Sequence, residues 1–93
     1  MDAAEYGRYD QPITDEWLDS SPFKRQGAMR YWRLGDDSKV TQDEGILIDV
    51  WGNANDGFKA TMVDYEVSIP MPPYCTANRG RLLALAAALG MLP

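Results

Sequence analysis

The most restrictive feature of the sequence is a run of strand-forming residues, followed by turn-forming residues and then by a segment of alternating polarity. Residues 46–51, Ile-Leu-Ile-Asp-Val-Trp, favour a β-strand. Residues 52–57 are Gly, Asn, Asp and Ala, mostly residues that tolerate a left-handed backbone and form hairpin loops. Residues 58–69 alternate in the manner of a half-buried antiparallel strand. The sequence therefore predicts a hairpin at the centre of the fold.

The alternation also predicts which side chains share a face. In the first strand one face carries Ile46, Ile48 and Val50, and the other carries Leu47, Asp49 and Trp51. In the second strand one face carries Thr61, Val63, Tyr65, Val67 and Ile69, and the other carries Asp64, Glu66 and Ser68. We therefore expect one face of the sheet to be exposed and acidic.

Two shorter elements are predicted before this hairpin. Residues 14–18 have a capping Thr14 and acids in the first turn, which favour a short helix. Residues 28–34 are rich in large side chains and predict a strand, closed by turn-forming residues at 35–38. Residues 39–41 are a candidate short return strand.

A helix is predicted at the C-terminal end. The prolines of residues 70–73 cannot continue a strand ladder, so this segment is a connector. A helix over residues 77–89 follows, capped by Thr76 or Asn78, and Gly90 ends it so that the last residues fold back. Its apolar stripe consists of Leu82, Leu85, Ala86 and Leu89.

These elements predict an α+β fold: an antiparallel sheet of three or four strands, with the C-terminal helix packed on one face and a short N-terminal helix. A length of 93 residues suits a single domain, residues 1–93. Residues 1–12 show no apolar periodicity and are expected to form a flexible or irregular arm. With 45% hydrophobic residues, the chain has enough apolar material for a core.

The residue inventory excludes several kinds of site. Cys75 is the only cysteine and there is no histidine, so an internal disulfide, a Cys/His zinc site and histidine-based catalysis are excluded. Carboxylates are the remaining candidates for catalysis, but no other group converges on them. The turn at residues 52–57 lacks oxygen ligands where a calcium loop needs them. We therefore expect a non-enzymatic protein with no catalytic residues, no metal and no cofactor.

The N-terminal sequence is not that of a signal peptide, and the longest apolar stretch, residues 82–92, is about half a membrane span. We therefore expect a cytoplasmic protein that does not contact a membrane.

Charge is distributed unevenly along the chain, whose net charge is −5. Residues 1–22 and 34–66 are acidic, whereas residues 23–33 carry only basic charges. The segments are either ordinary solvated faces or an acidic surface that competes for a cationic site. The excess of acids disfavours direct nucleic-acid binding. The candidate partner-binding residues are Asp36, Asp37, Asp43, Glu44, Asp64, Glu66 and Trp51.

Two further sets of residues are candidates for recognition. Arg79 and Arg81 lie at the predicted N-terminus of the last helix, where an anion such as a nucleotide phosphate would bind. The alternative is an intramolecular partner from the acidic N-terminal segment. Six aromatic residues occupy both parities of their strands and cannot all be internal: Trp17, Tyr31, Trp32, Trp51, Tyr65 and Tyr74. Trp32 and Trp51 are predicted to be core or interface residues.

In size, acidity, absence of catalytic motifs and helix-plus-sheet composition, the whole chain resembles the small inhibitors encoded by phages and mobile elements, such as anti-CRISPR proteins. The resemblance involves no defining motif. It implies a protein that acts in the host cytoplasm and blocks a nucleic-acid or subunit site on a bacterial defence complex, with acidic side chains in place of phosphates. The partner would then be a protein or ribonucleoprotein complex. The alternatives are a self-associating structural module, such as a homodimer, and a small binder of an anionic nucleotide.

Overall fold

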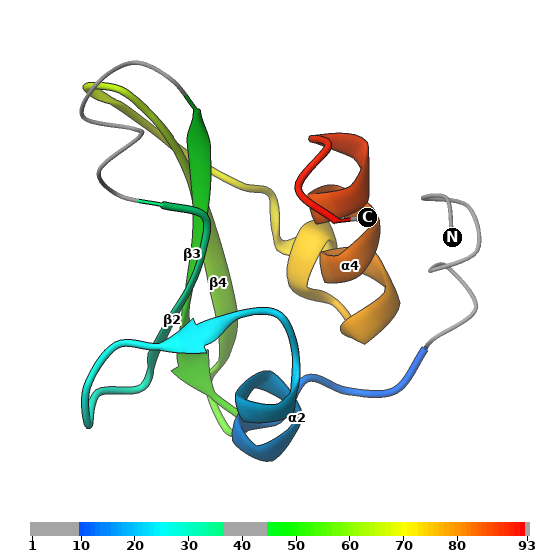
Figure 1. The fold of residues 1–93 in the computed structure, drawn as a ribbon. Coiled ribbons are helices and arrows are strands. Elements are labelled where there is room, and N and C mark those ends of the chain that lie inside the picture. The colour runs from blue at the N-terminus through cyan, green and yellow to red at the C-terminus, as the bar shows by residue number, and fades with distance from the viewer. Residues whose placement is uncertain (1–9, 37–44, 93) are drawn as a thin grey trace.

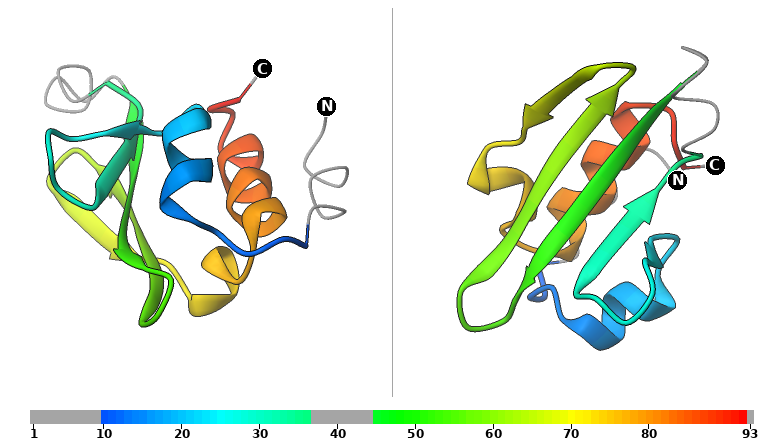
Figure 2. Two further views of the ribbon diagram at one scale, coloured as in Figure 1. Left: turned by 90° about the horizontal axis from the view of Figure 1, so that it is seen from below. Right: turned by 90° about the vertical axis from the view of Figure 1, so that its left-hand side faces the viewer.

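Five antiparallel strands pair in sequence order to form one sheet, and two helices lie together on one of its faces (Figures 1 and 2). The computed structural model describes residues 10–36 and 45–92. The strands are β1 (Lys24–Arg25), β2 (Tyr31–Leu34), β3 (Ile46–Asn53), β4 (Gly57–Asp64) and β5 (Val67–Pro70). The helices are α2 (Asp15–Ser20), the 3-10 turn η1 (Pro73–Thr76) and α4 (Arg79–Ala88). The predicted α+β class is confirmed.

The sheet has five strands, so the prediction of three or four was wrong. One reason is that residues 58–69 are not a single strand. The chain reverses at Tyr65 and Glu66, and Asp64 pairs with Val67. Tyr65 adopts a left-handed φ of 53° without any glycine or asparagine beside it to signal a turn. The predicted acidic face of one long strand is therefore also wrong, since Glu66 lies in the turn and Asp64 ends β4.

The other missed strand is β1. Lys24 pairs with Arg33 and Arg25 with Trp32, so this two-residue strand extends the sheet beyond β2. The predicted strand at 28–34 is shortened to β2, because residues 28–30 belong to the turn that joins β1 to β2. The candidate return strand at 39–41 lies outside the described residues.

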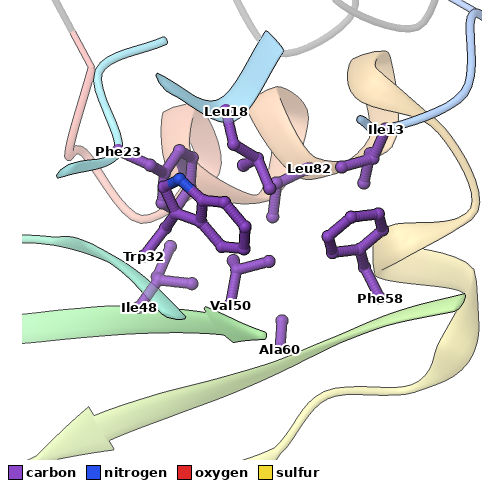
Figure 3. Close-up of a cluster of buried hydrophobic side chains, with 10 residues drawn as sticks. Ile13, Leu18, Phe23, Trp32, Ile48, Val50, Phe58, Ala60 and Leu82 are labelled. Atoms are coloured by element: carbon purple, nitrogen blue, oxygen red, sulfur yellow. The ribbon is translucent and has the colours of Figure 1, made fainter. Parts of the chain in front are cut away.

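The core lies between the sheet and the helices (Figure 3). The sheet contributes Trp32, Ile48, Val50, Phe58 and Ala60, and the helical side contributes Ile13, Leu18, Phe23, Leu82 and Ala86. Trp32 is fully buried, and its ring packs edge-on against Phe58 at 6.0 Å between centroids. The predicted apolar faces of β3 and of the last helix are confirmed.

Polar contacts of side chains hold the helix ends. Thr14 accepts a hydrogen bond from the backbone N–H of Trp17, as predicted. Of the two predicted caps for the last helix, Asn78 accepts a hydrogen bond from the backbone N–H of Arg81 at 2.8 Å, so α4 begins at Arg79 and not at residue 77. Gly90 ends α4 with φ of 73°, and the N–H of Met91 donates to the Ala86 carbonyl at 2.9 Å.

Neither helix of the described residues has the length and apolar character needed to span a membrane.

Asp19 joins α2 to the sheet. Its carboxylate accepts hydrogen bonds from the Trp32 indole N–H at 2.9 Å and from two nitrogens of Arg25. The Arg25 guanidinium also lies 4.7 Å from the Trp32 ring. Hydrogen bonds from Arg25 and then Trp32 lower the pKa of Asp19 from its usual 3.8 to about 2. The cluster therefore favours the charged carboxylate.

Candidate functional site

The face of the sheet turned away from the helices is covered by no described helix, and it lies toward the viewer on the right of Figure 2. We call it the helix-free face. Strand register places on it Lys24, Tyr31, Arg33, Leu47, Asp49, Trp51, Lys59, Thr61, Val63 and Ser68. An antiparallel sheet needs only one face packed on a core. On the helix-free face Leu47 and Asp49 are nevertheless buried, whereas Lys24 and Lys59 are exposed.

An aromatic pair lies on this face. Tyr31 of β2 and Trp51 of β3 are directly opposite each other in the ladder. Their rings stack with centroids 6.3 Å apart and planes 15° apart. Both side chains are half-buried, which leaves part of each ring for contact with another molecule.

A buried carboxylate lies next to the aromatic pair on the same face. Asp49 is 5% exposed, although it points to the face opposite the core. Its Oδ1 lies 2.8 Å from Nε of Arg33, and its Oδ2 accepts a hydrogen bond from the Tyr31 hydroxyl. This pairing satisfies a charge that would otherwise be costly to bury.

The same contacts fix the ionisation of both partners. Burial, followed by the hydrogen bond to Asp49, raises the pKa of the Tyr31 hydroxyl above its usual value. Hydrogen bonding to Asp49 raises the pKa of the Arg33 guanidinium, which therefore stays charged. The Tyr31 hydroxyl is a neutral donor, and the cluster holds the ring of Tyr31 in one position.

A shallow groove of about 480 Å³ runs beside the aromatic pair. It is lined by Met29, Arg30, Tyr31, Asp49, Trp51, Thr61, Val63 and Ser68. Most of its lining is apolar, and Arg30 stands at the rim with 61% of its side chain exposed. Such a groove suits an apolar side chain from a partner better than it suits an enclosed small molecule.

The structure does not bring the predicted acidic residues together with Trp51. Asp64 is five positions along β4 from Lys59, the partner of Trp51, which corresponds to about 16 Å at the usual strand rise. Glu66 is exposed in the next turn, and Asp36 is exposed shortly after β2. Asp37, Asp43 and Glu44 lie outside the described residues.

The two arginines of the predicted anion site do not converge either. Arg79 is engaged within the chain: its guanidinium donates to the Pro12 carbonyl at 2.8 Å and to the Gln11 side chain at 2.9 Å. It thus binds the N-terminal segment through neutral oxygens rather than through acids. Arg81 instead lies over the exposed ring of Tyr74 at 4.2 Å.

Sequence reasoning named Tyr31 as an aromatic candidate but missed its two partners on this face, Asp49 and Arg33. The three residues come from two strands and meet only through strand pairing. The signal available in the sequence was an acid in the middle of the most apolar strand. Among the described residues, no group of three or more acidic or cysteine side chains is placed to hold a metal ion.

Comparison of the chain with protein-family models, with curated proteins and with solved structures finds no match.

Proposed function

We propose that the protein is a non-enzymatic binding protein that contacts another protein through its helix-free face. The observation that supports this proposal is the stacked pair of Tyr31 and Trp51 beside an apolar groove. Tyrosine, tryptophan and arginine are the residues that dominate binding energy at protein interfaces. All three line this groove, with Arg30 at its rim.

The hydrogen bond between Tyr31 and Asp49 favours tight recognition by the aromatic pair. Asp49 holds Tyr31 by its hydroxyl group, and Tyr31 in turn packs against Trp51. Side chains that are already fixed lose little conformational entropy when a partner binds. The buried carboxylate therefore has a positioning role in this proposal.

The test compares two variants that add the same charge to different faces. Val63→Glu places a carboxylate in the groove, and Ala88→Glu places one on the exposed side of α4. Partners are captured from an extract of the source cells and measured by quantitative mass spectrometry. We expect Val63→Glu to reduce the capture of specific partners by about tenfold or more, and Ala88→Glu to leave it unchanged. Equal capture by the two variants would exclude the helix-free face as the partner-binding site.

A second candidate is the inhibitor suggested by the resemblance, which would use acidic side chains to occupy a nucleic-acid or subunit site on a bacterial defence complex. One observation favours it: Asp64 and Glu66 are both exposed near the β4–β5 turn, and neither forms an ion pair with a described residue. Charge reversal of both residues to lysine tests it in the same capture experiment. Loss of partners with this variant, but not with Val63→Glu, would favour the acidic surface.

A further inference from the structure

Among the described strand residues, those on the helix-free face carry the opposite charge to the chain as a whole. The net charge of the protein is −5, but this face carries Lys24, Arg33 and Lys59. Asp49 is the one acid among the described strand residues on this face, and it is buried and paired with Arg33. The order of charges along the sequence does not show that these basic residues share one face.

The two lysines are available to a partner. Lys24 and Lys59 are exposed, and neither forms an ion pair with a described residue. Lys59 is the ladder partner of Trp51, so the two side chains leave the sheet at neighbouring positions on the same face. Arg30 is paired with Asp15 at 3.3 Å but remains largely exposed at the groove rim.

From this arrangement we propose that the groove receives an acidic peptide segment of the partner, with an apolar side chain in the groove and carboxylates against Lys59 and Arg30. The proposal rests on the function proposed above. Met29, 63% exposed at the groove, can adapt to the shape of the inserted side chain. Charge complementarity would then give both the partner preference and fast association.

The geometry favours a peptide over single-stranded nucleic acid. Tyr31 and Trp51 stack on each other at 15°, so each uses one ring face within the pair instead of offering it to a base. The acidic excess of the whole chain would also repel a long phosphate backbone. A short peptide needs only the local cations.

Addition of a partner strand at the sheet edge explains these features less well. The edge strand β1 has two residues, and the opposite edge strand β5 ends in Pro70, which has no N–H to donate. Neither edge offers a long ladder, whereas the face offers a groove, aromatic rings and cations together.

The experiment titrates the ¹⁵N-labelled full chain with three probes and follows the amide and indole signals by NMR. The probes are a peptide with phenylalanine flanked by glutamates, the same peptide with lysines, and a single-stranded oligothymidylate. We expect the glutamate peptide, at up to about 5 mM, to shift the signals of Trp51, Thr61 and Val63. We also expect the shifts to weaken as the salt concentration rises.

A matched pair of charge reversals locates the cations. Lys59→Glu and Arg81→Glu each reverse one exposed cation, the first on the helix-free face and the second on α4. We expect Lys59→Glu to weaken binding of the glutamate peptide about fivefold and Arg81→Glu to leave it unchanged.

Three results would overturn the proposal: no shift with the glutamate peptide, equal or stronger binding of the lysine peptide, or stronger binding of the oligothymidylate. If Val63→Glu still abolished partner capture in any of these cases, the helix-free face would remain the proposed binding site. Only the proposal that its ligand is an acidic peptide would then be wrong. If Val63→Glu left capture unchanged, the proposed function itself would fail.

Discussion

Asp49 lies at the centre of β3 on the face without helices, and only 5% of it is exposed. A carboxylate survives there because Arg33 and Tyr31 satisfy its oxygens. We predict that Asp49→Ala lowers the free energy of unfolding by about 3 kcal/mol, since it removes the buried carboxylate that accepts hydrogen bonds from Arg33 and Tyr31. Urea denaturation measures this loss. Asp64→Ala removes an exposed acid and is the control, with an expected change below about 0.5 kcal/mol; equal losses would contradict the role of Asp49.

Asp19 provides a prediction of pH dependence. Its pKa is about 2 in the folded protein against a usual 3.8, so the folded state favours the charged form. A lowered pKa contributes stability above the unfolded value, and this contribution is lost as the pH falls from about 4 to about 2. The stability difference between the unmodified protein and Asp19→Asn should therefore be constant near neutral pH and shrink across that window. Thermal unfolding at a series of pH values measures it, and a difference that persisted at pH 2 would contradict the prediction.

At the scale of elements, the hairpin of β3 and β4 depends on a close approach of its backbones. Gly52 has φ of 128°, and a Cβ there would lie 2.3 Å from the carbonyl oxygen of Gly57. We predict that Gly52→Ala destabilises the protein by about 3 kcal/mol or more, because the backbone cannot move aside. Gly57→Ala is the matched control: its φ of 88° is also strained, but the surrounding space is open, and its expected cost is about 1 kcal/mol. Chemical denaturation of both variants gives the comparison, and similar losses would refute the steric argument.

For the whole molecule, the contact between the two layers depends on few side chains. Leu82 of α4 is fully buried between the helix and the sheet (Figure 3), whereas its neighbour Leu83 is only half-buried. We predict a loss of about 3 kcal/mol for Leu82→Ala, from lost burial and the cavity left behind. The same substitution at Leu83 should cost less than about 1 kcal/mol. Equilibrium unfolding monitored by tryptophan fluorescence distinguishes them, and equal effects would mean that α4 docks in another way.

Much of this molecule could be predicted from local sequence patterns. The faces of β3 follow from strict alternation, the caps of α2 and α4 from Thr14 and Asn78, and the end of α4 from Gly90. Each of these features depends on residues within a few positions of one another. Their physical causes, strand parity and unsatisfied backbone groups at helix ends, are already present in the chain before it folds.

Only the tertiary structure decided where the chain reverses after β4 and which residues lie on the helix-free face. The turn at Tyr65 has no glycine or asparagine to signal it, and it lies where β4 pairs back with β5. The Asp49 cluster and the basic character of the helix-free face arise from residues on different strands, aligned by register. A cation and an acid distant in sequence have no defined separation until the ladder sets it. The sequence by itself therefore determined the two helices, the β3–β4 hairpin and the net charge. Packing determined the edge strands, which charges meet and which remain for a partner.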